Sequence, residues 1–167
     1  MKLTNTHSLD VEKVSVITET MNVIGDVTSD CMIILEGSIQ GTITTKESFE
    51  SYVDSKVNGN IHAKAALLGG ELIGNVTCEE TINVDLNTSV NGNLEANTIT
   101  IAGTVNGDVH AHEVLQLKAS AQVNGHITCA LVSIEEGARI DGSFKMVKKQ
   151  KENPILPLDY EEPFEEN

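Results

Sequence analysis

Short runs of alternating apolar and polar residues fill positions 14–146, and most of these runs meet at a glycine. Within each run, apolar positions recur at steps of two, which is the side-chain period of a β-strand. No segment keeps the i, i+3, i+4, i+7 spacing of an amphipathic helix. The pattern therefore predicts an all-β chain built from many short strands.

The runs are copies of one repeat that centres on a turn with the sequence Val-Asn-Gly. Successive turn glycines lie 16, 18, 15, 18, 15, 18 and 17 residues apart. A repeat of this length is too short to close a sandwich by hairpins, and it fits one coil of a solenoid. Eight coils stacked about 4.8 Å apart would make a rod of roughly 38 Å. The eight glycines are Gly25, Gly41, Gly59, Gly74, Gly92, Gly107, Gly125 and Gly142.

The residues around each glycine form columns that we expect to stack from coil to coil. Large apolar residues stand two positions before and two positions after the glycine, and a smaller residue stands four positions after it. Positions eight and six before the glycine give two further columns, which place Val53, Leu86 and Ala119 in line with Leu35. The longer copies add three residues before these columns, which predicts one lengthened face in alternate coils. Each long copy gains one apolar residue in this way: Phe49, Ile82 and Leu115.

Proline and asparagine support this assignment. All three prolines follow the last copy, as expected where nearly every backbone N–H donates to a strand ladder. Glycine at the corner permits backbone angles that other residues avoid. The asparagines that precede it tolerate left-handed geometry and can form side-chain ladders along the stack. These asparagines are Asn58, Asn91, Asn106 and Asn124.

We divide the chain into an N-terminal tail at 1–13, a β-helical domain at 14–146 and a disordered C-terminal tail at 147–167. The last segment holds the prolines and a basic block followed by an acidic one, a composition typical of disorder. A short linear motif around 155–158 or Tyr160 is the alternative interpretation of this tail.

Composition narrows the possible partners. A net charge of −14 argues against nucleic acid, which requires a basic face, and against broad adhesion to anionic lipid. Aromatic residues make up only 3% of the chain, and tryptophan is absent, which favours many thin, equivalent core layers over one large core.

The cysteines and the N-terminus indicate a reducing cytoplasm. Cys78 and Cys129 share the small inward column but lie three coils apart, too far for a disulfide, so we interpret them as core residues. Cys31 falls in a longer loop and is the more accessible thiol. The sequence shows neither a signal-peptide run nor about 18 consecutive apolar residues.

The phased V-N-G-[ND]-[IVL] turns at alternating intervals of 15 and 18 resemble the bactofilins, which are bacterial polymer-forming cytoskeletal proteins. The resemblance covers about residues 14–146 and implies a right-handed parallel β-helix of triangular section. It also implies nucleotide-independent, non-polar filaments built by contacts between terminal coils, and a scaffolding role for cell-envelope or morphogenesis factors. Members of this family often bind the inner membrane through an N-terminal segment, for which residues 1–3 offer a minimal anchor.

The end coils are the predicted functional sites, because a solenoid exposes unpaired strand edges and an open apolar cross-section there. Phe144 is the aromatic member of its column, and its alternative role is to plug its own coil. We predict a polymerisation interface made of Phe144, Ile140 and Met146 at one end and of Val14, Val16 and Ile17 at the other.

Two other classes of protein stay open at this stage. One is a non-polymerising adaptor that binds an enzyme through its faces or its tail. The other is a β-helical acyltransferase or carbonic anhydrase, whose hexapeptide periodicity this chain does not keep.

The histidines give the best candidates for such chemistry. His62 and His110 lie three coils apart and cannot share a metal ion. Asp108 and His126 stand in one column of adjacent coils, with His110 and His112 nearby, but an exposed polar ladder explains them better. We therefore predict no catalytic residue, no metal and no cofactor.

Overall fold

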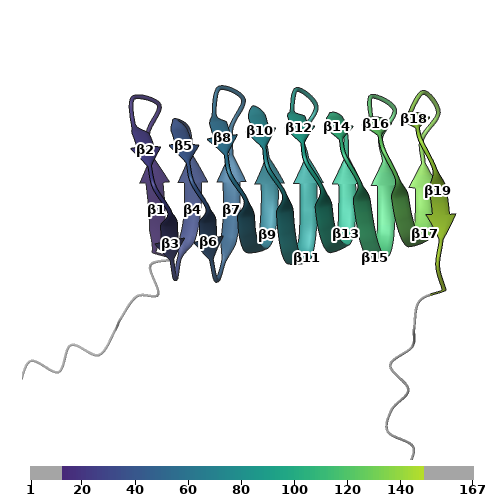
Figure 1. The fold of residues 1–167 in the computed structure, drawn as a ribbon, viewed down its shortest axis with the longest axis horizontal. Coiled ribbons are helices and arrows are strands. Elements are labelled where there is room, and N and C mark those ends of the chain that lie inside the picture. The colour runs from purple at the N-terminus through teal and green to yellow at the C-terminus, as the bar shows by residue number, and fades with distance from the viewer. Residues whose placement is uncertain (1–12, 149–167) are drawn as a thin grey trace, which may run out of the picture.

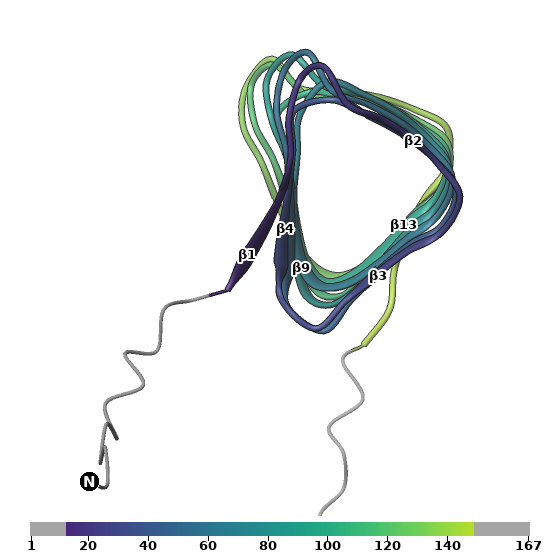
Figure 2. The same ribbon diagram turned by 90° about the vertical axis from the view of Figure 1, so that its left-hand side faces the viewer.

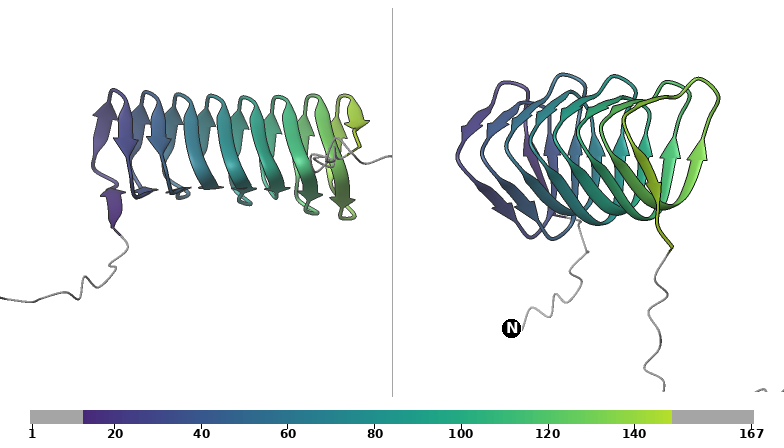
Figure 3. Two further views of the ribbon diagram at one scale, coloured as in Figure 1. Left: turned by 90° about the horizontal axis from the view of Figure 1, so that it is seen from below. Right: turned by 45° about the vertical axis from the view of Figure 1, so that its right-hand side comes forward.

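The chain forms a parallel β-solenoid in the computed structural model, which describes residues 13–148 (Figure 1). Seen from its N-terminal end, the solenoid has a triangular section, and the chain runs clockwise as it recedes (Figure 2). The helix is therefore right-handed. Figure 3 shows the coils stacked along one axis. The predicted fold class is confirmed, while the predictions for residues 1–12 and 149–167 lie outside the described part.

Each coil contributes to three flat faces, which we name A, B and C in chain order. Face A contains β1 (Val14–Ile17), β4 (Met32–Leu35) and β7 (Ser48–Ser51). Face C contains β3 (Val27–Ser29), β6 (Ile43–Thr45) and β19 (Phe144–Met146). Five longer strands run from face C round a corner onto face A of the next coil: β9 (Ile61–Leu68), β11 (Val76–Val84), β13 (Leu94–Ile101), β15 (Val109–Leu117) and β17 (Ile127–Ile134).

Face B is a separate sheet of eight short strands, one from each coil. Its order follows the chain, and neighbouring strands pair in parallel register without a shift. The strands are β2 (Asn22–Ile24), β5 (Ser38–Gln40), β8 (Lys56–Asn58), β10 (Glu71–Ile73), β12 (Ser89–Asn91), β14 (Thr104–Asn106), β16 (Gln122–Asn124) and β18 (Arg139–Asp141).

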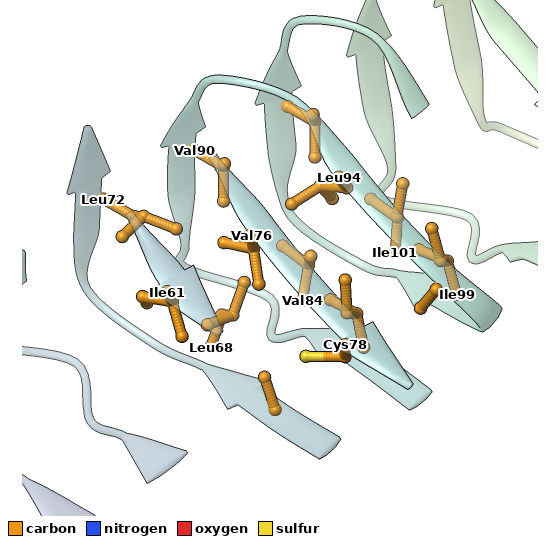
Figure 4. Packing of buried hydrophobic residues seen from close by; sticks show 14 of the residues in the cluster. Ile61, Leu68, Leu72, Val76, Cys78, Val84, Val90, Leu94, Ile99 and Ile101 are labelled. Atoms are coloured by element: carbon orange, nitrogen blue, oxygen red, sulfur yellow. The ribbon is translucent and has the colours of Figure 1, made fainter. Parts of the chain in front are cut away.

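The core is a stack of thin apolar layers inside the triangle. Inward side chains from equivalent positions lie directly above one another, as the close view in Figure 4 shows for Val76, Leu94 and their neighbours. These columns correspond to the positions two before and two after each corner glycine. In the middle of the rod they are almost completely buried; Val90, Val105, Val76 and Leu94 are at most 1% exposed. Each layer is closed by the next coil rather than by large side chains, which explains how so few aromatics suffice.

The alternating repeat length comes from two corners, and here the predicted alignment is wrong. Turns between faces A and B have four residues at 18–21, 52–55, 85–88, 118–121 and 135–138, but two at 36–37, 69–70 and 102–103. A long turn accounts for two of the three extra residues of a long copy. The third forms a bulge at the corner between faces C and A, as between Thr77 and Thr81. The long copies therefore do not lengthen a face.

The correction moves several residues between the core and the surface. Ile82 pairs with Ile99, and Val84 pairs with Ile101, so both belong to columns that the short coils already contain. Val53 and Leu86 lie in the long turns with more than half of their side chains exposed. Backward counting from the glycine failed because the extra turn residues lie between the glycine and these columns.

From the second coil onward, the glycine corner between faces B and C packs against the same corner of the coil before it. Gly92 has a φ of 155°, and a Cβ atom there would lie 1.9 Å from the carbonyl oxygen of Gly74. Gly25, in the first coil, has a φ of 131° but would meet nothing within 4 Å. Glycine is thus required by close packing inside the stack, whereas in the first coil only the backbone angle requires it.

Two polar ladders run along the outside of this corner. Asn106 donates from Nδ2 to Oδ1 of Asn91 over 3.0 Å and accepts from Nδ2 of Asn124 over 2.7 Å, which confirms the expected asparagine ladder. In the position after the glycine, a side-chain oxygen accepts the backbone N–H of the same position in the next coil. This bond recurs from Asn60 to Asn75 and onward to Asn93.

Candidate assembly surfaces at the ends of the solenoid

In the C-terminal end coil, the last residues of the inward columns lie at the surface. Phe144 pairs with Ile127, and Met146 pairs with Cys129, so both continue columns that are fully buried one coil earlier. Phe144 is 39% exposed and Met146 is 55% exposed because no further coil follows them within residues 13–148. Ile140 continues the face B column and is half-buried. The structure thus brings all three predicted residues onto one apolar cross-section.

Charged side chains surround this cross-section but do not enter it. Ile134 and Val132 supply further apolar surface from face A. Arg139, Asp141 and Lys145 belong to the same coil and are exposed. An apolar centre with a charged rim is the usual arrangement of a protein–protein interface.

The N-terminal end coil exposes the opposite side of the same columns. Ile17 pairs with Leu35, Val23 with Ile39, and Val27 with Ile43. Ile17 remains 8% exposed, while Val23 and Val27 are half-buried. Val23 and Val27 were not among the predicted interface residues, although they are the first members of the apolar columns on either side of the glycine.

Val14 and Val16 lie on the same coil but face away from the core. They pair with Met32 and Ile34. The residue between those two, Ile33, is buried on the inward side of face A, so Met32 and Ile34 lie on its outer side. Both valines therefore belong to the outer surface of face A and not to the apolar cross-section. Their part in an interface stays a prediction that rests on the edge of β1 alone.

Both ends also present unpaired backbone. The path of the large sheet ends at β1 and β19, and face B ends at β2 and β18. In the described part of the chain these strands pair with a neighbour on one side only, so a row of N–H and C=O groups remains available on the other. Such edges readily accept another strand. Each end of the rod thus combines free hydrogen-bonding groups with apolar side chains.

The histidine candidates form surface contacts rather than a reactive set. Asp108 Oδ1 accepts the backbone N–H of His126 over 3.0 Å, while the His126 ring contacts Ser143 Oγ. His112 Nε2 lies 3.1 Å from Glu95 Oε1, and its ring stacks at an angle on His110. Asp108 and His126 are therefore successive members of the polar ladder. Within residues 13–148, no group of three or more potential ligands could hold a metal ion.

Cys78 and Cys129 occupy the buried environment that the sequence predicts, whereas Cys31 lies in a two-residue corner and not in a longer loop. Cys78 and Cys129 are buried in the small inward column, three coils apart. Burial raises the pKa of the Cys78 thiol to about 12, against the opposing effect of a backbone hydrogen bond at Ala63, and burial also raises the pKa of Cys129. Cys31 is half-buried at a bend before β4. All three thiols are free.

The architecture and its ends define a single-domain parallel β-solenoid that is left uncapped at both ends of the described range. A family model described as "Bactofilin: Polymer-forming cytoskeletal" matches residues 15–94 and, in a second overlapping placement, residues 70–145. The chain therefore belongs to the bactofilin family, a family of polymer-forming cytoskeletal proteins. No curated protein and no solved structure matches it. Over residues 13–148 there is no helix with the length and apolar character needed to cross a bilayer.

Proposed function

We propose that this protein is a bacterial cytoskeletal scaffold whose subunits join end to end, without nucleotide, into non-polar filaments. The supporting observation is the contrast within single columns: Ile127 is 1% exposed, but Phe144, its neighbour in the last coil, is 39% exposed. Burying this surface against another subunit is favourable at roughly 25 cal/mol per Å² of apolar area. Membership of a polymer-forming family supports the same conclusion.

The proposed contact joins like ends. Two C-terminal coils meet through Phe144, Ile140 and Met146, and two N-terminal coils meet through the surface around Ile17. Contact between like ends has two-fold symmetry, so alternating the two contacts gives a filament without polarity. The filament acts in the cytoplasm, where it positions cell-envelope or morphogenesis factors, and attachment to the inner face of the membrane would pass through the N-terminal tail.

Electron microscopy of the purified chain without nucleotide tests the proposal, and we expect filaments. Phe144→Arg places an unpaired charge in the contact and should abolish or shorten them, because burying such a charge is costly. Ile73→Arg is the matched control, since Ile73 is 46% exposed on face B in the middle of the rod. Circular dichroism should show the β-content of the unmodified chain in both variants.

Two outcomes would contradict the proposal. Filaments of normal length from the Phe144→Arg chain would place the contact elsewhere. Persistent monomers of the unmodified chain at high concentration would instead support the non-polymerising adaptor. A gold label at the C-terminus tests polarity, because labels should occur in close pairs in a non-polar filament and at even intervals in a polar one.

A further inference from the structure

The last strand leads the chain onto the apolar surface of Phe144, Ile140 and Met146, which we name the C-terminal cross-section. The backbone N–H of Val147 donates to the carbonyl oxygen of Cys129 over 2.8 Å, so this bond continues the parallel pairing of β19 with β17. β19 lies at the extreme end of the rod (Figure 1). The segment that follows is therefore tethered beside the cross-section, which gives it a high effective concentration there.

The residues directly after the last strand are too polar to form face A of a further coil. In the last coil, face A supplies Val132 and Ile134 to the inward columns. Residues 148–153 read Lys-Lys-Gln-Lys-Glu-Asn, so neither alternating set of positions offers an apolar side chain. Burying such groups without partners is costly. The solenoid pattern therefore ends here for a reason that the sequence makes plain.

Apolar residues return at the distance where they would lie over the cross-section. In the described coils, nine to twelve residues separate the last inward residue of face C from the inward residue of face B in the next coil. The interval is nine from Ala63 to Leu72 and twelve from Cys78 to Val90.

The same interval counted from Met146 gives residues 155–158, which read Ile-Leu-Pro-Leu. In a ninth layer these positions would stack on Ile140, the last described member of the face B column. The apolar run thus falls where the open end needs apolar cover.

Two prolines make this run suited to close the stack rather than to continue it. Pro154 and Pro157 have no backbone N–H, so a strand that contains them offers a following subunit an incomplete row of donors. Proline at a sheet edge is a common means of stopping further strand addition. Residues 154–158 could therefore cover the apolar side chains of the last coil without presenting an edge as receptive as that of β18.

Charge favours the same placement. The turn at 135–138 of the last coil carries Glu135 and Glu136, both exposed. The polar stretch 148–153 contains three lysines, and in a ninth layer it would cross face A beside this turn. Exposed ion pairs are worth only about 0–1 kcal/mol each, so they would orient the segment while its apolar residues hold it.

We propose that residues 149–158 fold back as a cap on the C-terminal cross-section, with the apolar side chains of 155–158 packed over Ile140 and Phe144. This inference rests on the proposed function, because the cap competes with the like-end contact at that surface. A subunit must release its cap before a second C-terminal coil can bind. A cap closed in about nine chains of ten would raise the concentration needed for filament growth about tenfold.

Disulfide trapping in the dilute full-length chain tests where the segment lies. The background carries Cys31→Ser, so the remaining native thiols are buried. Leu156→Cys is combined with Ile140→Cys, on the inward side of face B, or with Asp141→Cys, the next residue on its outer side. We expect the pair at 140 and 156 to close within one chain about ten times faster, because stacked residues about 4.8 Å apart suit a disulfide.

The pair at 141 and 156 is the control for random collision. Asp141 is exposed and Ile140 is half-buried, so an unattached segment would react faster at residue 141. Mass spectrometry of the monomer measures both rates without any filament. Equal rates, or faster closure at residue 141, would overturn the cap whatever is found about end-to-end assembly.

Sedimentation tests the competition by measuring the lowest concentration at which filaments form. Leu156→Asp with Leu158→Asp should lower it about tenfold, because the cap opens although the chain becomes more acidic. Glu161→Gln with Glu162→Gln is the control and should leave it unchanged. A decrease in the control alone would mean that repulsion from the acidic residues limits assembly, and it would overturn the regulation, as would no decrease in the aspartate variant. If no variant forms filaments, the proposed function fails and the trapping rates decide the cap.

Discussion

The middle and the ends of the rod contain the same repeat in two different situations. In the fifth and sixth coils, Val90, Leu94 and Ile99 are at most 1% exposed, because a coil lies on either side. In the last coil, equivalent positions hold Ile140, Phe144 and Val132, which are half-buried or more exposed. A repeat of this kind therefore buries its apolar side chains fully only when a neighbouring coil lies on each side.

This difference separates stability from assembly. Changes in the middle remove contacts that hold the solenoid together, whereas changes at an end remove contacts that only another subunit could complete. The two regions should respond differently to the same substitution, and three measurements can sharpen or break that distinction.

The largest effect should come from the corner glycines. Gly92→Ala would place its Cβ atom 1.9 Å from the Gly74 carbonyl oxygen, while Gly25→Ala would meet nothing. We expect Gly92→Ala to destabilise the fold by more than about 4 kcal/mol and Gly25→Ala to cost only the backbone strain of about 1–3 kcal/mol. Urea unfolding followed by circular dichroism measures both, and equal losses would show that neighbouring coils do not impose the glycine.

A smaller difference should separate two core columns. Ile99→Ala removes a fully buried side chain and should lower the free energy of unfolding by about 2–5 kcal/mol. Phe144→Ala removes a side chain that is already 39% exposed and should cost about 1–2 kcal/mol. Both are measured at low protein concentration, because any self-assembly would add to the apparent stability. A larger loss for Phe144→Ala would indicate that Phe144 plugs its own coil.

The smallest effect concerns the thiols and can be measured without any substitution. Burial raises the pKa of Cys78 to about 12 and also raises that of Cys129, so both remain protonated and unreactive in the folded chain. A thiol reagent at pH 8 should modify Cys31 first and the other two only on unfolding. The raised pKa values also predict that stability falls as pH rises above about 8.5, because the unfolded chain then releases thiol protons that the folded chain retains. Rapid modification of all three cysteines in the native state would mean that the middle coils open readily.

The residues at the two ends of the solenoid show which parts of the candidate site the column pattern could predict. Phe144, Ile140 and Met146 could be placed at one end because each is the last member of an apolar column. Val14 and Val16 lie three residues and one residue before the inward Ile17, so strand alternation puts them on the opposite face, and pairing with Met32 and Ile34 agrees with this. Val23 and Val27 carry the same signal at the other end, because each is the first member of an apolar column.

The sequence by itself determined the number of coils, the strand period and the inward residues on either side of each corner glycine. Side chains alternate between the two faces of a strand, and a glycine recurs at the same corner of every coil, so only one arrangement remains for the side chains near it. It did not determine where the longer coils place their extra residues. Backbone pairing with the coils before and after decides that: Val84 must lie between Leu68 and Ile101, so the surplus goes to the corners. Only the tertiary structure could therefore put Val53 and Leu86 in the exposed turns between faces A and B instead of in the core.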